Sequence, residues 1–209
     1  MKIFPIIFIL IILQSCQIQI IGITNDYDKL NENQKNLIKP LENFQNLNIR
    51  EVYTINAMQL KDELKKHERS LVYIFTNGCS AEACKPIYVY EDYAKKNGYS
   101  LFLVMNGFGD IDKTLVQDIS SPLFAMDANY YETPYTRKYS RYFENELMGL
   151  NQEEKQKEFL GSLYFFEDGN FLQIAKICLT KTTYYEDTFT HFVLHPYRFR
   201  RILASLKNK

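Results

Sequence analysis

The segment from Leu71 to Pro86 constrains the fold of this chain more than any other stretch. It opens with LVYIFT, a continuous apolar run that contains several β-branched residues. Such a run is typical of a buried strand covered on both faces, because a half-solvated strand alternates apolar and polar residues. FTNGCSAEACKP then places two cysteines, Cys79 and Cys84, before a helical pattern. The segment therefore predicts a central strand, a cysteine-bearing loop and a helix.

The position at which this helix begins decides the geometry of the two cysteines. On an ideal helix, residues that are five positions apart, as Cys79 and Cys84 are, have Cα atoms about 8–9 Å apart. The Cα atoms of a disulfide lie at most about 7 Å apart. A bridge therefore requires Cys79 to lie in the loop. Either Pro86 is the first helical residue, or Ser80 is the N-cap and the helix kinks at Pro86. The expected buried face of the helix consists of Ile87, Tyr90, Tyr93 and Ala94.

Both helix beginnings bring at least one sulfur close to N–H groups that have no intrahelical partner. Such groups stabilise a thiolate and lower the pKa of a thiol below about 8.5. The thiolate is the species that attacks a disulfide. We therefore expect Cys79, on the solvent side, to attack and Cys84 to resolve the mixed disulfide. The carboxylate of Glu82 acts in the opposite direction, because a nearby negative charge raises the pKa of a thiol.

The first fifteen residues differ from the rest of the chain. Lys2 is their only charged residue, and an apolar stretch runs from Ile3 to Leu13. This stretch is shorter than the roughly 20 residues that cross a bilayer and has the length of a signal-peptide core. LQSC resembles the lipobox of bacterial lipoproteins, whose cysteine, here Cys16, becomes lipidated. An ordinary secretory signal or an uncleaved anchor is the alternative.

Each of these interpretations places the remainder of the chain outside the cytoplasm. We predict a signal peptide over residues 1–15 and a lipid at Cys16 that anchors the protein to a membrane of the bacterial periplasm or to the outer membrane. Three cysteines then remain, and disulfides persist in this environment. Cys79 and Cys84 form the natural pair, while Cys178, in the strand-like run IAKICL, is expected to be buried and inert.

Composition limits the class of protein and of partner. The chain has 209 residues, of which 46% are hydrophobic, and this suits one globular domain with an appendage. The formal net charge is zero, and no run of like charges occurs. This argues against a nucleic-acid partner. The sequence makes no prediction of the oligomeric state.

The pattern divides the chain into a tether and a domain. Residues 16–48 are predicted to be a lipidated tether with one short helix from Glu32 to Lys39, although they could equally form an extension that packs on the fold. Residues 49–207 are predicted to be the folded domain. Its expected elements are strands 50–55, 71–76, 100–105 and 122–127, helices beginning at Asn56, near Pro86, at Ile111 and at Thr133, a hairpin over 161–179 turning at Asp168–Gly169, and a final helix over 196–206.

The helix that begins near Thr133 carries aromatic residues at helical spacing. We interpret this stripe as a core face rather than as a platform for a ligand. It consists of Tyr135, Tyr139, Tyr142, Phe143 and Leu147.

The order of these elements resembles the thioredoxin fold. Three segments carry the resemblance: IFTNGCSAEACKP after the central strand, SPLFAMDAN before the third helix, and LYFFEDGNFLQ as the hairpin. The resemblance covers about residues 49–207 and implies an α/β three-layer sandwich with a mixed central sheet. It also implies a helix–strand insert ending in PLFAMD, similar to that of membrane-anchored thioredoxin-like reductases and peroxiredoxins. The implied activity is cofactor-free thiol–disulfide exchange with protein thiols or disulfides, with Cys79 and Cys84 as catalytic residues.

Two features differ from thioredoxin-like enzymes. Those enzymes carry C-x-x-C, whereas this chain carries C-x-x-x-x-C. They also place a cis-proline before the hairpin, where it shapes the substrate groove and prevents metal capture. Here that place falls near Leu160 or Gly161, and no proline occurs between Pro134 and Pro196. The alternative is therefore a plain structural disulfide in an accessory or binding lipoprotein that has kept the fold without the chemistry.

A metal site is the third hypothesis. Copper chaperones for cytochrome oxidase resemble this architecture and use C-x-x-x-C with a distant histidine. The candidate ligands here are Cys79, Cys84 and either His191 or His195, since two thiolates and an imidazole suit Cu(I). His67 is expected to end an exposed helix.

Overall fold

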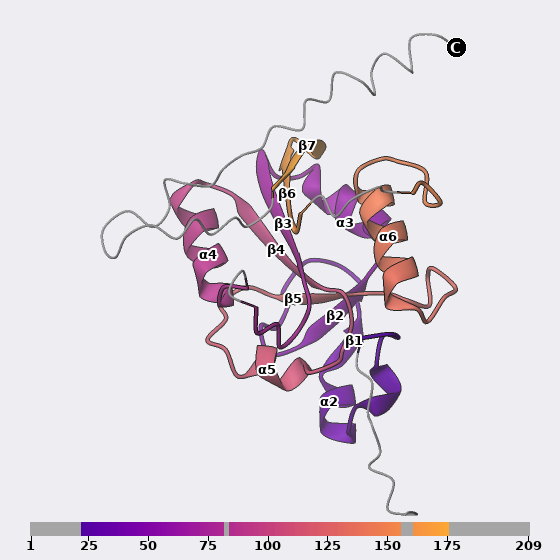
Figure 1. Cartoon of the computed structure of the whole chain (residues 1–209). Coiled ribbons are helices and arrows are strands. Elements are labelled where there is room, and N and C mark those ends of the chain that lie inside the picture. Colours follow the sequence, from indigo (N-terminus) through magenta and orange to yellow (C-terminus); the bar gives the residue numbers. More distant parts are fainter. Residues whose placement is uncertain (1–21, 82–83, 156–160, 176–209) are drawn as a thin grey trace, which may run out of the picture.

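A seven-stranded mixed sheet forms the centre of the computed structural model, which describes residues 22–81, 84–155 and 161–175 (Figure 1). The strands lie in the order β1-β2-β5-β4-β3-β6-β7. Neighbouring strands are parallel from β1 to β3, whereas β6 and β7 are antiparallel to their neighbours. Their bounds are β1 Ile38–Pro40, β2 Val52–Ile55, β3 Arg69–Phe75, β4 Ser100–Met105, β5 Leu123–Met126, β6 Leu163–Glu167 and β7 Asn170–Ala175.

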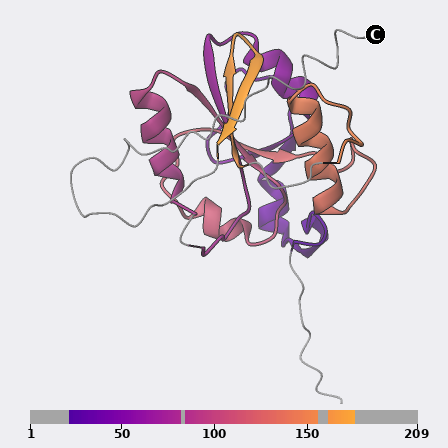
Figure 2. The same cartoon turned by 45° about the horizontal axis from the view of Figure 1, so that its top comes forward.

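Helices cover both faces of this sheet. One face packs against α3 (Ala57–Leu64) and α6 (Thr136–Leu147), and the other against α4 (Ile87–Lys96) and α5 (Ile111–Leu115). Figures 1 and 2 show the two helix pairs on opposite sides of the strands. The short helices η1 (Tyr27–Lys29) and α2 (Glu32–Asn36) precede the sheet in the chain. The predicted fold class is therefore confirmed as an α/β sandwich with a mixed sheet, consistent with a thioredoxin-like arrangement.

The central strand β3 joins two hydrophobic cores. Leu71, Tyr73 and Phe75 are buried against α4 and α5. Val72 and Ile74, which alternate with them, are buried against α3 and α6. Both faces of the strand are therefore covered, as predicted, and this explains its continuous apolar run.

Local sequence signals account for several element boundaries. Asn56 and Gln59 form the predicted capping box at the beginning of α3, with hydrogen bonds of 2.9 and 3.0 Å between each side chain and the other residue's N–H. Asp168 and Gly169 both have positive φ, 49° and 75°, as a tight turn between antiparallel strands requires. The predicted hairpin is therefore confirmed for its described part.

Two boundaries differ from the prediction because of tertiary contacts. α6 begins at Thr136 rather than after Thr133, since the backbone before it pairs with the N-terminal segment through Thr24 and Tyr135. Tyr135 is consequently 58% exposed and does not belong to the predicted aromatic core face. The helix predicted from Glu32 to Lys39 ends at Asn36, because the residues that follow join the sheet as β1.

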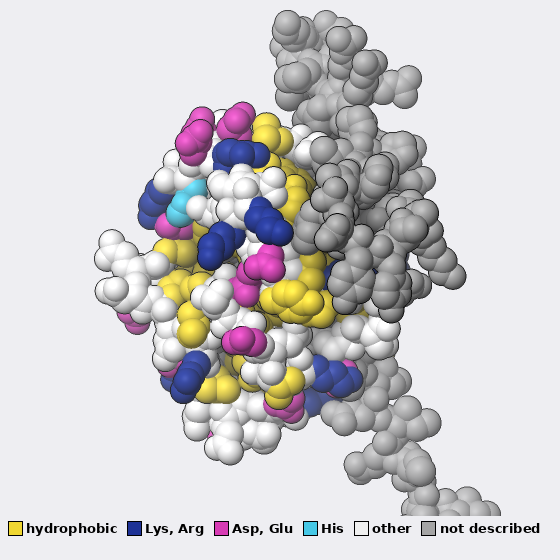
Figure 3. Space-filling model, turned by 90° about the vertical axis from the view of Figure 1, so that its left-hand side faces the viewer, with side chains coloured by type: hydrophobic (Ala, Val, Ile, Leu, Met, Phe, Trp, Pro, Cys, Tyr) yellow, Lys and Arg dark blue, Asp and Glu magenta, His cyan; other side chains and the backbone are white. Residues whose placement is uncertain are grey.

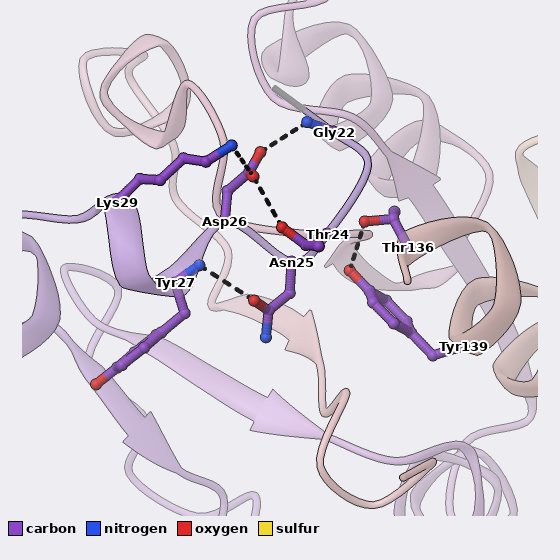
Figure 4. A network of polar contacts seen from close by, with 8 residues as sticks. All are labelled: Gly22, Thr24, Asn25, Asp26, Tyr27, Lys29, Thr136 and Tyr139. Carbon is purple, nitrogen blue, oxygen red and sulfur yellow. Dashed lines mark hydrogen bonds and ion pairs between the residues drawn. The ribbon is translucent and has the colours of Figure 1, made fainter. Parts of the chain in front are cut away.

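The N-terminal segment from Gly22 to Lys29 is packed on the domain (Figure 4). The buried carboxylate of Asp26 accepts hydrogen bonds from the Gly22 N–H (2.7 Å), the Thr24 hydroxyl (3.2 Å) and the Lys29 ammonium (2.6 Å). The backbone carbonyl of Asn25 accepts from the Phe108 N–H at 2.8 Å. The described part of the predicted tether therefore contacts the folded domain, which is the alternative that the sequence left open.

Several predictions fall outside the described residues. These are the signal peptide over 1–15, the lipidation of Cys16, the effect of the Glu82 carboxylate on the thiols, the buried position of Cys178, the ligand roles of His191 and His195, and the final helix over 196–206. Within 22–81, 84–155 and 161–175, no helix has the length and apolar character needed to cross a bilayer.

A buried carboxyl group, Glu144 of α6, makes stability depend on pH. Burial raises its pKa from 4.5 to about 7, although the hydroxyl of Tyr164, which donates to it, acts to lower the pKa. Between these two pH values the native protein holds a proton that the unfolded chain has released. The free energy of unfolding is therefore expected to fall as the pH rises through this window.

We predict that Glu144→Gln removes this contribution. Urea unfolding at pH 4.5 and at pH 8 measures it. The wild-type protein is expected to lose up to about 3 kcal/mol more than the variant between the two pH values. An equal pH dependence in both proteins would contradict the burial of an ionisable carboxyl group at this position.

Candidate functional site

The two cysteines of the loop between β3 and α4 form a disulfide. Their Cα atoms lie 5.9 Å apart. α4 begins at Ile87 with Pro86 as its N-cap, so both cysteines precede the helix. Of the two predicted helix beginnings, the structure thus has the one near Pro86. Cys79 is exposed and Cys84 is half-buried, which agrees with the expected order of solvent access.

The disulfide loop leaves the sheet at the edge where the parallel strands end. β3 and β4 run side by side, so the loops after Phe75 and Met105 emerge together. The Asn106 N–H donates to the Phe75 carbonyl at 2.9 Å, and its side-chain amide donates to the Thr76 hydroxyl at 2.9 Å. In open α/β sheets, ligands bind outside the carboxyl ends of the strands. The disulfide lies at this edge.

A pocket of about 210 Å³ lies beside the disulfide. Buried apolar and aromatic residues line one part, and residues of α5 and its C-terminal end line another. The first group includes Tyr73, Phe75 and Ile87, and the second consists of Lys113, Thr114 and Gln117. Pockets for drug-sized ligands measure about 300–1,000 Å³. This pocket is therefore better suited to a single side chain of a larger partner than to a large cofactor.

The loop is anchored before Cys79 by the buried side chain of Asn77. Its amide nitrogen donates to the Gly107 carbonyl at 2.8 Å, and its amide oxygen accepts from the Thr114 hydroxyl at 2.6 Å. The next residue, Gly78, has a φ of 64° and packs closely against Lys113. The chain therefore enters the disulfide loop in a conformation that α5 and the loop preceding it hold.

The loop is anchored again where it enters α4. The N–H of Ile87 donates to the side-chain oxygen of Gln117 at 3.0 Å. The first N–H of α4 thus has a side-chain partner from the end of α5. This differs from the expectation that such a group would face a cysteine sulfur, and the reason is a tertiary contact that no local signal reveals.

Among the described residues that line the pocket, the charged side chains are lysines. Lys85 and Lys113 both line it, and Lys113 forms an ion pair with Asp110 at 2.8 Å. Burial raises the pKa of Tyr73, which lines the pocket, and of Tyr90, whose ring stacks on that of Tyr73 with centroids 3.9 Å apart. Both hydroxyls therefore stay protonated at neutral pH and contribute no negative charge.

The predicted metal ligands are not brought together within the described residues. No group of three His, Cys, Asp or Glu side chains there could hold a metal ion. His67 lies apart from the disulfide, with its ring nitrogens 2.9 Å from the Ser100 hydroxyl and 3.3 Å from the Glu63 carboxylate. The hypothesis of a Cu(I) site with His191 or His195 stays a prediction.

Glycine lies near the place that the cis-proline of thioredoxin-like enzymes would take. Tyr73 of β3 pairs with Leu163 of β6 in antiparallel register. Gly161 therefore lies toward the end of β3 from which the disulfide loop leaves. No peptide bond is cis in the part of the chain that the structure describes.

Sequence reasoning missed the residues that hold the loop. These are Asn77, Gly78, Thr114 and Gln117. An Asn-Gly dipeptide directly after a strand is a turn signal and could have identified the first two. Nothing in the sequence pairs Asn77 with Thr114, which is 37 residues away.

Comparisons with protein-family models, curated proteins and solved structures find no match for this chain. The resemblance to thioredoxin-like proteins therefore rests on the order of the elements and on the disulfide loop between β3 and α4. Both observations are compatible with that fold.

The close approach at Gly78 generates a prediction. A Cβ atom there would lie 2.6 Å from Cδ of Lys113 and 2.9 Å from Cβ of Asp110. Gly78→Ala is therefore expected to lower the free energy of unfolding by about 2 kcal/mol or more, from backbone strain and displacement of α5 together.

Gly98→Ala is the matched control. Gly98 also has a positive φ, 68°, but a Cβ atom there would meet nothing within 4 Å. Only the backbone penalty of about 1 kcal/mol is expected. Urea unfolding of the oxidised proteins measures the free energy of unfolding of both variants. Equal losses in Gly78→Ala and Gly98→Ala would show that α5 does not pack tightly against the loop.

Proposed function

We propose that this protein is an extracytoplasmic, lipid-anchored thioredoxin-like protein that exchanges disulfides with protein substrates through Cys79 and Cys84. The observation that carries the proposal is the disulfide between an exposed and a half-buried cysteine, next to a pocket at the carboxyl edge of the sheet. A substrate sulfur can reach Cys79 from solvent, while Cys84 stays close behind it. These are the two positions that exchange requires.

Reduction of a substrate then takes place in two steps. The thiolate of Cys79 attacks one sulfur of the substrate disulfide and displaces the other as a thiolate, which takes up a proton. Cys84, after losing its proton, attacks the Cys79 sulfur of this mixed disulfide and releases the second substrate thiol. Two electrons pass from the dithiol to the substrate, and the Cys79–Cys84 bond forms. Oxidation of a substrate dithiol is the reverse sequence.

Polypeptides are the substrate class that the surface supports. The pocket has room for about one side chain. Next to two of its lining residues in the sequence are Tyr88, 56% exposed, and Val116, 83% exposed. Figure 3 shows the side of the molecule on which α4 lies in Figure 1, where hydrophobic side chains reach the surface among charged ones. Exposed apolar side chains that adjoin pocket-lining residues in the sequence suit a docked peptide segment.

The N-terminal sequence supports the proposed location. A signal peptide over residues 1–15 and a lipid on Cys16 would hold the domain at a membrane surface outside the cytoplasm. A disulfide such as Cys79–Cys84 persists in that environment. No nucleic-acid partner is proposed.

The second candidate is an accessory or binding lipoprotein with a permanent disulfide. The contact between the Ile87 N–H and Gln117 favours it, because this N–H is then not available to stabilise a thiolate. In this case the bridge only fixes the loop between β3 and α4. The two candidates differ in whether the disulfide turns over.

The test is turnover by the purified protein without its lipid, with insulin as the disulfide substrate. Cys79→Ser is expected to abolish reduction while leaving the far-ultraviolet circular dichroism unchanged, because the attacking sulfur is lost. Cys178→Ser, the matched substitution outside the pair, is expected to keep wild-type activity.

Two results would reject the proposal. Equal activity of wild type and Cys79→Ser would show that the pair does not carry the reaction. Absence of activity in the wild type would favour the accessory protein. Stoichiometric Cu(I) uptake that is lost in His191→Ala or His195→Ala would instead support the metal hypothesis.

A further inference from the structure

The α5 segment, defined here as residues 110–117, contacts the disulfide loop at both of its ends. At the entrance, the Thr114 hydroxyl donates to Asn77 at 2.6 Å. At the exit, Gln117 accepts from the Ile87 N–H at 3.0 Å. Both partners lie outside the ring that the disulfide closes between Cys79 and Cys84. Neither contact therefore requires the S–S bond.

These contacts limit how far the two sulfurs can separate once the bond is reduced. The segment between the anchors runs from Gly78 to Pro86, and Gly78 is itself pressed against Lys113 and Asp110. A loop with fixed ends explores less space than a free one, so each thiol has a higher effective concentration near the other. A higher effective concentration favours the disulfide over the dithiol.

Residues 106–108, which lead into the α5 segment, are held by three hydrogen bonds. The Gly107 carbonyl before it accepts from Asn77, and the Phe108 N–H donates to Asn25 of the N-terminal segment at 2.8 Å. The Tyr139 hydroxyl donates to the carbonyl of Asn106. Figure 4 shows the surroundings of Asn25, whose side chain contacts Tyr27, and of Tyr139, which contacts Thr136. The anchors of the loop therefore rest on both the sheet edge and α6.

We propose that the α5 segment sets the reduction potential of the Cys79–Cys84 couple by holding both ends of the loop, with Thr114 and Gln117 as positioning residues. This inference rests on the proposed function, because it concerns the same redox pair. Neither residue takes part in the exchange itself. Their role is to keep the two thiols of the reduced protein close together. This favours the disulfide and therefore lowers the reduction potential of the couple.

The couple is measured against glutathione. The disulfide takes two electrons and two protons from two glutathione thiols, which gives the Cys79–Cys84 dithiol and one glutathione disulfide. Alkylation of the free thiols followed by mass spectrometry reports the fraction of each form at equilibrium. The ratio of disulfide to dithiol at each glutathione potential gives the equilibrium constant of this reaction. It is measured on the protein without its lipid.

Two variants test the two anchors separately. Thr114→Val removes the hydroxyl donor of a side chain that is 1% exposed while keeping its shape. Gln117→Leu removes the acceptor for the Ile87 N–H at a half-buried position, where the fold tolerates the change better. Each is expected to reduce the equilibrium constant for disulfide formation by about five- to tenfold, and tenfold corresponds to about 30 mV.

Thr54→Val is the control for loss of a threonine hydroxyl. Thr54 donates to the Lys39 carbonyl at 3.4 Å, between β1 and β2, away from the loop. The reduction potential of the Thr54→Val variant is expected to equal that of the wild type. A general loss of stability affects the oxidised and reduced forms alike and leaves the potential unchanged. A shift in Thr114→Val, which leaves the contact between the Ile87 N–H and Gln117 in place, therefore identifies a positioning role.

The outcomes separate this inference from the proposed function. If the wild type reduces insulin but neither variant changes the potential, the role of α5 is wrong and the proposed function stands. If both variants shift the potential of a protein that reduces no substrate, the role of α5 stands and the proposed function fails. If the disulfide does not re-form after reduction, or if Thr54→Val shifts the potential equally, the inference is wrong.

Discussion

The two buried hydrogen bonds of the Asn77 side chain connect the parts of the chain that meet at the carboxyl edge of the sheet. They join the end of β3 to the Gly107 carbonyl after β4 and to Thr114 in α5. A buried amide that lost either partner would cost about 1–3 kcal/mol. The loop that carries Cys79 is therefore held in one position, and the pocket, the disulfide and the contacts of α5 are arranged around it.

The sequence predicted those elements whose signals are local. The apolar run of β3, the Asn56–Gln59 capping box and the Asp168–Gly169 turn each contain the physical reason for their own structure, and each is confirmed. The beginning of α6 was misplaced because the N-terminal segment pairs with Tyr135, a contact between residues far apart in the chain. Thr114 and Gln117, which hold the disulfide loop, were missed for the same reason, whereas Asn77 and Gly78 carry a local turn signal.

The geometry of the cysteines could be predicted only in part. The separation of five residues required Cys79 to lie in a loop, and the structure has both cysteines there. The sequence could not show that Gln117 occupies the first N–H of α4. This contact changes the electrostatic argument, because positive charge for a thiolate would then come from Lys85 and Lys113 of the pocket rather than from that N–H. A cysteine pair with C-x-x-x-x-C spacing therefore depends on other groups for stabilisation of its thiolate than a pair at the N-terminus of a helix does.

Exchange at this loop requires the two sulfurs to stay together when no bond joins them. A crystal or solution structure of the reduced protein measures this directly, through the distance between the Sγ atoms of Cys79 and Cys84. Both sulfurs are expected to remain beside the pocket within about 4 Å of each other, with the contacts of Asn77 and Gln117 intact, since these anchors lie outside the disulfide ring. A reduced structure in which the loop opens and the sulfurs face away from each other, or in which one of them becomes enclosed in the core, would contradict this expectation.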